Sequence, residues 1–169
     1  MPTDPTQHVH THAAVTRVRE TLAAAGLADT ITVMPDATHT ALAAADALGC
    51  DLGEIAKSII FRAEDGRTVL VITSGRNRVD EKKVATTLGQ KIGKADADFV
   101  RAQTGFVIGG VAPLAHEVPP IALMDEDLFR YAAIWPAAGH PNSMFRISPQ
   151  DLARVTCARV TDVAQRKTP

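Results

Sequence analysis

The stretch EIAKSIIFRAEDGRTVLVITSG, residues 54–75, decides the fold because it holds two apolar runs separated by a short polar turn. Asp65-Gly66 between two such runs is a strong signal for a β-hairpin. We therefore predict antiparallel strands at residues 55–63 and 67–73. The hairpin makes this a sheet-containing protein, and the elements on either side of it decide the class.

One residue of the first predicted strand, Lys57, falls on an unexpected face. Because successive residues of a strand point to opposite faces, Lys57 shares its face with the apolar residues Ile55, Ile59 and Phe61. A lysine in that phase loses solvation unless its ammonium group reaches a strand end, a cleft or an anionic partner. The periodicity supports a snorkelling lysine at the start of the strand and a functional lysine equally well.

Helix and strand signals alternate along the rest of the chain. Predicted helices cover residues 12–26, 38–49, 78–89, 96–105 and 148–155, with Thr38 or Thr40, Asp80, Asp96 and Ser148 as N-caps. Further predicted strands cover residues 30–34, 121–124, 143–148 and 158–163. Interspersed strands and helices with one tight hairpin favour a mixed α+β sheet over a purely parallel one.

A length of 169 residues and a hydrophobic content of 46% suit one well-buried core. We predict a single domain at residues 13–165, preceded by a flexible terminus at residues 1–12. That terminus holds three histidines, for which a frayed end is favoured over a metal-binding tract: His8, His10 and His12. Lys and Arg number 18 against 19 Asp and Glu, so any site for a polyanion must be local.

The cysteine pattern and the lack of a signal-peptide pattern indicate the expected cellular compartment. Cys50 and Cys157 are far apart and form no Cys-x-x-Cys or Cys/His cluster, which argues against a structural zinc site and a disulfide framework. Neither a signal peptide nor an apolar run of about 18 residues is evident. We therefore expect a cytoplasmic protein with no membrane partner.

Two irregular segments carry candidate site residues. Gly109 and Gly110 allow a ligand to approach the backbone, and Pro113 stiffens the turn, which leaves nearby N–H groups free to bind an oxyanion or a carbonyl. Most Gly-Gly loops are turns only, so alone this pattern favours a simple turn. The loop at residues 136–142 offers His140 and Asn142 as hydrogen-bonding groups, although a loop histidine is more often ordinary surface.

Sequence motifs of covalent and metal hydrolases are missing. No GxSxG, HExxH, GxxxxGK[ST] or GxGxxG pattern is found, which argues against a serine, cysteine or metal hydrolase. An enzyme built on the residues named above would work by positioning and backbone donors, with no cofactor and no metal.

Five segments together resemble the family of YbaK-type and prolyl-tRNA-synthetase-associated editing domains. They are IAKSIIF, SGRNRVDEKKVA, TGFVIGGVAPLAH with a GxxxP pattern from Gly109 to Pro113, DEDL, and AAGHPNSMFRISPQDLARVT. They follow the order of the family across residues 38–164. The resemblance implies a mixed, barrel-like β-sheet with flanking helices, and a deacylase that hydrolyses the ester joining a wrong amino acid to tRNA.

The resemblance also implies roles for individual residues. Lys57 matches the family's essential lysine, which is expected to hold the 3′-terminal adenosine. Gly109 and Gly110 match the loop whose backbone is expected to hold the aminoacyl group and to place the hydrolytic water. The expected lining of the substrate pocket comprises Thr40, Ser58, Val111, Pro113, His140 and Asn142.

Two further features are compatible with an editing enzyme. The small residues Ala43 and Ala44 could form a pocket wall that excludes the cognate amino acid by size, although packing on the sheet explains each of them more simply. A local excess of positive charge at residues 76–101 could contact tRNA phosphates, and a solvated helix face explains it nearly as well. The candidate tRNA contacts are Arg76, Arg78, Lys82 and Lys83.

We therefore expect a trans-editing hydrolase, with tRNA-Pro carrying a small non-cognate amino acid as the default substrate and prolyl-tRNA synthetase as a candidate partner. The water nucleophile is expected to be activated by the terminal ribose hydroxyl, with loop N–H groups stabilising the oxyanion. Two alternatives stay open: a non-catalytic tRNA- or nucleotide-binding module of the same fold, and a hydrolase of small esters or amides.

Overall fold

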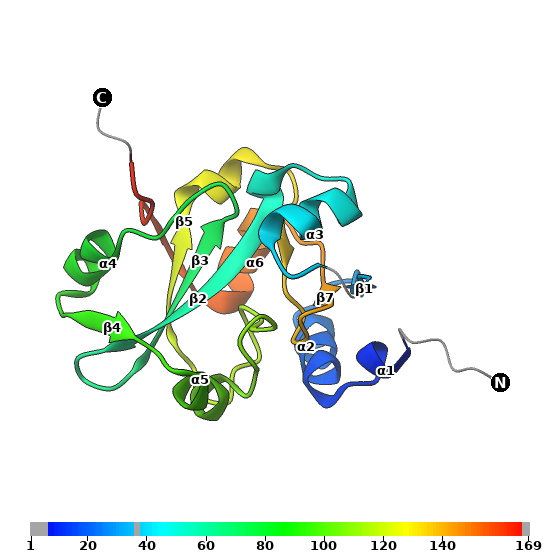
Figure 1. Cartoon of the computed structure of the whole chain (residues 1–169), viewed down its shortest axis with the longest axis horizontal. Helices are drawn as coiled ribbons and strands as arrows, with labels where there is room; N and C mark the ends of the chain where they lie inside the picture. The colour runs from blue at the N-terminus through cyan, green and yellow to red at the C-terminus, as the bar shows by residue number, and fades with distance from the viewer. Residues whose placement is uncertain (1–6, 36–37, 167–169) are drawn as a thin grey trace.

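A six-stranded sheet forms the centre of the computed structural model, which describes residues 7–35 and 38–166 (Figure 1). The strands are β1 (Thr32–Val33), β2 (Ile55–Ala63), β3 (Thr68–Ser74), β4 (Ile92–Lys94), β5 (Ile121–Asp125), β6 (Trp135–Pro136), β7 (Ser143–Met144) and β8 (Arg159–Thr161). The α-helices are α1 (Gln7–His10), α2 (Ala13–Ala24), α3 (Ala41–Leu48), α4 (Glu81–Leu88), α5 (Ala97–Thr104) and α6 (Pro149–Thr156). Two 3₁₀ turns, η1 (Leu52–Glu54) and η2 (Glu126–Arg130), connect them.

The sheet is mixed and open. Its order is β4-β2-β3-β5-β8, with β6 also paired to β2, and β1 and β7 form a separate two-stranded sheet. The prediction of a barrel-like sheet is wrong, because β4 and β8 stand at opposite ends of this order and do not pair. A barrel requires pairing that continues around the whole sheet, and this sheet ends instead in the three-residue strands β4 and β8.

The hairpin at the centre of the sheet follows its sequence signal closely. Strands β2 and β3 pair antiparallel from Ala56↔Ser74 to Arg62↔Thr68, around the predicted Asp65-Gly66 turn. The predicted N-caps of four helices are confirmed as well. Each of four N-cap side chains accepts a hydrogen bond from its own helix: Thr40, Asp80, Asp96 and Ser148.

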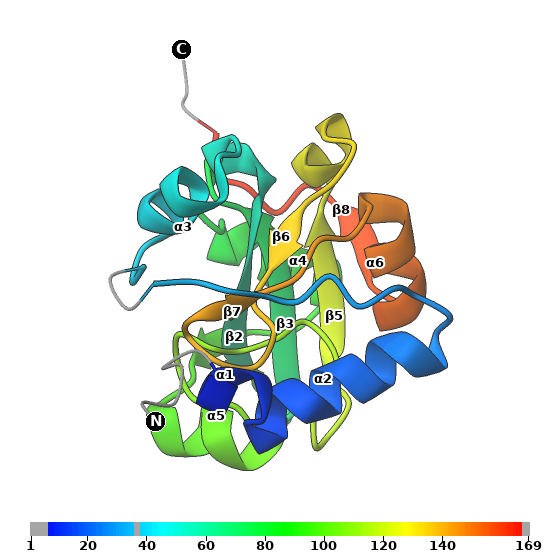
Figure 2. The same cartoon turned by 90° about the vertical axis from the view of Figure 1, so that its right-hand side faces the viewer.

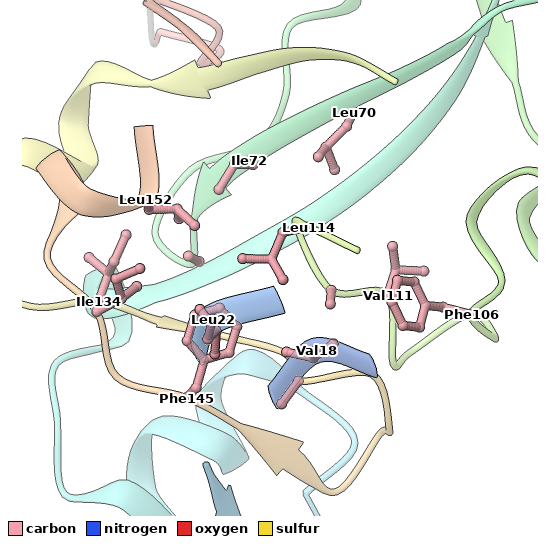
Figure 3. Packing of buried hydrophobic residues seen from close by; sticks show 14 of the residues in the cluster. Val18, Leu22, Leu70, Ile72, Phe106, Val111, Leu114, Ile134, Phe145 and Leu152 are labelled. Atoms are coloured by element: carbon pink, nitrogen blue, oxygen red, sulfur yellow. The ribbon is translucent and has the colours of Figure 1, made fainter. Parts of the chain in front are cut away.

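Both faces of the sheet are covered. On one face, Leu70 and Ile72 of β3 pack against α2, α6 and residues 106–114, as the close view in Figure 3 shows. On the other face, Val69 and Val71 pack with residues of α4 and of the C-terminal segment. All seven residues of β3 are therefore buried, which explains why its sequence is a continuous apolar run and not an alternating one.

Helix α3 is anchored on a smaller cluster beside the main sheet. Ala44 and Ala45 of α3 pack with Met34, Ile55 and Met144, next to the β1–β7 pair. Figure 2 shows α3 on the side of the molecule that holds β7, away from α6. This packing brings the N-terminal turn of α3 to the edge of β2, where the candidate site lies.

The start of the described chain is packed on the domain. Residues 7–10 of the predicted flexible terminus form α1, in which Val9 is only 1% exposed and the other three residues are exposed, so this helix contacts the domain through Val9. Residues 1–6 of that terminus lie outside the described residues. No helix in the described ranges has the length and apolar character that crossing a membrane requires.

Candidate active site

A cavity of about 460 Å³ opens along one edge of β2. Strand β6 pairs with Ile55 and Ala56 at one end of β2, and β4 pairs with residues 61–63 at the other end. Residues 57–60 lie between these pairings and line the cavity. The other lining residues are Ile55 and Ala56 of β2, Thr38–Ala41 and Ala44 from α3 and its approach, Ala95, Val100, Ile108, Gly109, Val111, Ala137, Pro141, Ser143 and Met144.

Lys57 lies in this cavity, partly buried. Its Nζ donates a hydrogen bond of 2.8 Å to the main-chain oxygen of Asn77, in the loop after β3. Burial lowers the pKa of Lys57, and the positive charge of Arg78 lowers it further, while the carboxylate of Asp125 acts in the opposite direction. The lysine is thus a held, partly desolvated cation whose remaining donors can bind an anion or a polar oxygen.

Asn77 is itself fixed by two carboxylates at the end of β5. Its Nδ2 atom donates to Asp125 at 2.9 Å and to Asp127 at 2.7 Å. Asp125 is fully buried and also accepts hydrogen bonds from Thr73 Oγ1 and from the main-chain N–H of Ser74. The position of Lys57 therefore depends on groups from β3 and β5 that are far from it in the sequence.

The C-terminal segment adds Arg166 to this network. Arg166 donates to Asp127 at 2.8 Å, and this contact is the largest cause that keeps the pKa of Asp127 below its usual range. Arg166 also donates to Asp162 at 3.1 Å. Asp127 thus forms ion pairs with Arg166 and Arg130 and also accepts a hydrogen bond from the neutral amide of Asn77.

The glycine loop contributes to the cavity in a different way from the one expected. Gly109, at a φ of +93°, lines the cavity, whereas Gly110 is buried against the backbone of His140 and Pro141. A Cβ on Gly110 would lie 2.9 Å from both of those backbones, so close packing requires glycine there. The N–H of Gly110 donates to Val107 O at 3.0 Å, so it is not a free donor for an oxyanion.

The expected pocket-lining residues divide into two groups. Thr40, Ser58 and Val111 line the cavity, and Thr40 is at the same time the N-cap of α3. Three others, Pro113, His140 and Asn142, do not line it. Of the two alanines expected in the wall, Ala44 lines the cavity and Ala43 does not.

His140 is part of the loop that supports the cavity and belongs to a small group of histidines. Its Nδ1 accepts a hydrogen bond from the N–H of Asn142 at 3.0 Å. Its ring contacts that of His12 edge to face at 5.4 Å and that of His8 at 6.3 Å. In the described ranges, these rings and their neighbours form no group that could hold a metal ion.

The four candidate tRNA contacts differ in their availability. Arg76 forms a two-pronged ion pair with Asp51, at 2.8 and 2.9 Å, and Lys83 donates to Asp162 and to Ala164 O. Arg78 and Lys82 are exposed. Within the described part of the chain, neither forms a salt bridge, so these two are the cations best placed to contact phosphate.

Several cavity residues are absent from the sequence-based list. His39 stands at the rim and, together with Lys57, is an ionisable side chain of the lining. Ile59, Ile60, Val100 and Met144 supply apolar walls, and simple core packing explains each of them in the sequence. Asn77 and Asp125 sit in two of the segments that carry the family resemblance, yet only the fold shows that they meet.

Comparisons with known proteins agree on one family. A sequence profile described as the aminoacyl-tRNA editing domain matches residues 35–155. The chain is 34% identical over 132 residues to YwhH of Bacillus subtilis (strain 168), covering 77% of this chain and 83% of that one. It is 23% identical over 124 residues to the "Putative Cys-tRNA(Pro)/Cys-tRNA(Cys) deacylase EbsC" of Enterococcus faecalis (strain ATCC 700802 / V583), covering 73% and 76%.

A solved structure extends the likeness to the whole fold. The crystal structure described as "a putative trans-editing enzyme for prolyl tRNA synthetase" superposes with a TM-score of 0.87 at 37% identity, over 91% of this chain and 98% of that one. The profile match covers most of the chain and includes α3, β2, the glycine loop and the loop of His140. The chain therefore belongs to the aminoacyl-tRNA editing domain family.

Proposed function

We propose that the protein is a trans-acting deacylase that hydrolyses the ester of mischarged aminoacyl-tRNA, with tRNA-Pro carrying a small non-cognate amino acid as its substrate. Membership of the editing family supports a deacylase. The names given to the Enterococcus faecalis relative and to the superposed structure support tRNA-Pro and prolyl-tRNA synthetase as partners. The observation that carries the proposal is Lys57, held as a partly desolvated cation inside the cavity.

The geometry supports a separate role for each part of the cavity lining. The ammonium group of Lys57 pairs with a phosphate or ribose oxygen of the terminal adenosine, which replaces the solvation lost on burial. The backbone at Gly109 lies at the cavity wall, where a positive φ lets the chain approach a ligand closely. The wall residues Ala41 and Ala44 are small, so a larger side chain at either position would narrow the space for the amino acid.

Hydrolysis then needs a water molecule and a route for one proton. Water attacks the ester carbonyl carbon, the bond from that carbon to the ribose oxygen breaks, and the ribose oxygen receives a proton. The products are the free amino acid and tRNA with its terminal hydroxyl restored. The neighbouring ribose hydroxyl of the substrate relays the proton, because among the described residues no Asp or Glu side chain lines the cavity.

A deacylation panel tests the proposal. The protein is incubated with tRNA-Pro charged with alanine, serine, threonine, cysteine or proline, and the remaining ester is measured over time. We expect hydrolysis of one or two non-cognate esters and not of prolyl-tRNA, and loss of that activity in Lys57→Ala. The exposed Lys91 lies outside the cavity, so Lys91→Ala is a control of matched charge that should retain the native rate.

A non-catalytic binding module of the same fold predicts a different outcome. It would bind tRNA yet leave every ester intact, and Lys57→Ala would change affinity alone. If Lys57→Ala hydrolysed the esters at the native rate, the role proposed for the lysine would be wrong. Competition by uncharged tRNA separates a tRNA deacylase from a hydrolase of small esters, because only the former would be inhibited.

A further inference from the structure

The edge of β2 that faces the cavity is left without a strand partner over a short stretch. Pairing with β6 ends at Ala56↔Pro136, and pairing with β4 begins at Phe61↔Lys94. In the described part of the chain, no strand pairs with residues 57–60 on this edge, although the same residues pair with β3 on the other. Polar main-chain groups of a strand that lack a partner are costly unless water or a ligand satisfies them.

The hydrogen bonds at both ends of β2 show which main-chain groups face the cavity. The O atom of Ile55 and the N–H of Ala63 bond toward β3, to Gly75 and Arg67, at 2.7 and 2.9 Å. The N–H of Glu64 bonds toward the β4 side, to Lys91 O, at 2.9 Å. Odd-numbered residues therefore bond to β3 and even-numbered residues face the opposite edge, because these groups alternate along an antiparallel strand.

Within the unpaired stretch, the even-numbered residues are Ser58 and Ile60. The C=O of Ser58 and the N–H of Ile60 consequently form an acceptor and a donor on the cavity edge, one residue apart. Such a pair is what a neighbouring strand or a planar ligand with one donor and one acceptor recognises. The Ser58 hydroxyl is buried and, among the described residues, has no hydrogen-bond partner, so it is a third polar group of this stretch that is left unsatisfied.

The surroundings of this donor–acceptor pair suit a flat, largely apolar ligand. Ile59, Ile60, Val100, Ile108 and Val111 line the cavity around it. The cavity of about 460 Å³ lies within the range that holds a nucleoside-sized molecule. Lys57 borders the same stretch, so a sugar or phosphate oxygen beside it would leave an attached base next to residues 58–60.

We propose that the open edge of β2 binds the base of the 3′-terminal adenosine of tRNA through main-chain hydrogen bonds. The exocyclic amino group of adenine donates to the C=O of Ser58, and the adjacent ring nitrogen accepts from the N–H of Ile60. Proteins read unstacked RNA bases on these edges and pack apolar side chains on their faces. The inference rests on the deacylase function proposed above, since that function brings a terminal adenosine to Lys57.

Nucleotide analogues test this subsite directly. Adenosine 5′-monophosphate, purine riboside 5′-monophosphate and inosine 5′-monophosphate are titrated into ¹⁵N-labelled full-length protein, and amide shifts are followed by NMR. We expect adenosine monophosphate to shift the Ile60 amide, the purine analogue to bind more weakly, and inosine monophosphate to bind about tenfold to a hundredfold more weakly. Inosine presents an oxygen acceptor where adenine has its amino donor, so it faces the Ser58 carbonyl unfavourably.

The outcomes distinguish this subsite from the deacylase function. Equal binding of the three nucleotides, no binding, or shifts confined to Thr40 and Ala44 without Ile60 would overturn the adenine subsite. In a parallel assay, mischarged tRNA whose terminal adenosine is replaced by inosine should be hydrolysed at least tenfold more slowly at limiting substrate. Equal hydrolysis of both tRNAs would overturn the subsite and leave the deacylase intact. Selective binding of adenosine monophosphate without any deacylation would support the adenine subsite and overturn the proposed deacylase function.

Discussion

Lys57 and Asn77 are joined by a hydrogen bond of 2.8 Å from the lysine Nζ to the asparagine main-chain oxygen. Because the Asn77 side chain is bound by Asp125 and Asp127, the ammonium group is held in place by the end of β5. One donor of the Lys57 ammonium group is used in this bond, and Lys57 lines the cavity. A loop that had no side-chain anchor would hold this lysine less accurately.

Replacing Asn77 with alanine should therefore impair the reaction without removing any group that touches the substrate. We expect kcat/KM for deacylation to fall about tenfold to a hundredfold, because small displacements of positioning groups cost that much. The loss should appear mainly in kcat. Gln165→Ala is a matched control, since Gln165 is an exposed amide that donates to Val79 O in the same region. Native kcat in Asn77→Ala would show that the loop needs no anchor.

The size limit of the cavity should be set in part by Ala44. Ala44→Val adds two methyl groups to a residue that lines the cavity, and we expect the hydrolysis of the larger accepted esters to fall more than that of alanyl-tRNA. Ala43→Val makes the same change on the next residue of α3, outside the cavity, and should leave the order of substrates unchanged. Thermal unfolding of both variants separates a specificity effect from overpacking. An unchanged substrate order in Ala44→Val would contradict the assignment.

Contact with tRNA should depend on Arg78 more than on Arg76. Arg78 is exposed and close enough to Lys57 to lower its pKa, whereas Arg76 is paired with Asp51. We expect Arg78→Ala to weaken binding of uncharged tRNA and to reduce the slope of log affinity against log salt by about 1. Arg76→Ala should leave that slope nearly unchanged. Equal slopes for both variants and the native protein would place the tRNA elsewhere.

An experiment can decide whether the terminal ribose hydroxyl of the substrate or the side chain of His39 transfers the proton. Substrate assistance predicts that mischarged tRNA lacking the free terminal ribose hydroxyl is hydrolysed at least about a hundredfold more slowly. It also predicts that His39→Gln keeps the native rate, although His39 stands at the cavity rim. The opposite pattern, a slow His39→Gln variant and a fast deoxy substrate, would identify the histidine as the base.

Binding of tRNA should weaken on the alkaline side at a lower pH than an ordinary lysine predicts. The pKa of Lys57 lies below the ordinary value of 10.5, chiefly because of burial and next because of Arg78. The protonated form binds the anion, so affinity is lost as pH rises through that pKa. Arg78→Ala removes a repulsive charge and should move the loss to higher pH. Lys57→Arg should abolish it in the accessible range, because arginine stays charged.

The parts of the fold that depend on residues close together in the sequence could be predicted from it. The Asp65-Gly66 turn fixed the hairpin, and Thr40, Asp80, Asp96 and Ser148 begin their helices as cap preferences predict. Strands β4 and β6 were missed because three and two residues carry no usable periodicity. Closure of the sheet was predicted wrongly, since it depends on edges that the local pattern does not describe.

In the site, too, the sequence predicted features that depend on neighbouring residues and missed contacts between residues far apart in the chain. The alternation of residues in β2 marked Lys57 as unusual, and the glycine pair predicted a close approach of a ligand to the backbone, whereas Gly110 packs against the backbone of His140 and Pro141. Asn77 and Asp125 escaped notice because 48 residues separate them and each looks like ordinary loop or strand-end polarity. The glycine loop shows the opposite limit: the pattern predicted free N–H groups in it, yet the N–H of Gly110 is bound within a turn to Val107 O.

The opening in the edge of β2 also bears on how the protein avoids self-association. An unpaired strand edge on a molecular surface invites pairing with another chain and so promotes aggregation. Here the opening spans residues 57–60 only and is walled by α3 and the loops of Gly109 and Pro141. An edge of four residues walled in this way gives a second sheet little to pair with, whereas the subsite proposed above admits the single-stranded end of a nucleic acid. The same enclosure that makes the edge selective for a slender ligand thus protects the protein from edge-to-edge aggregation.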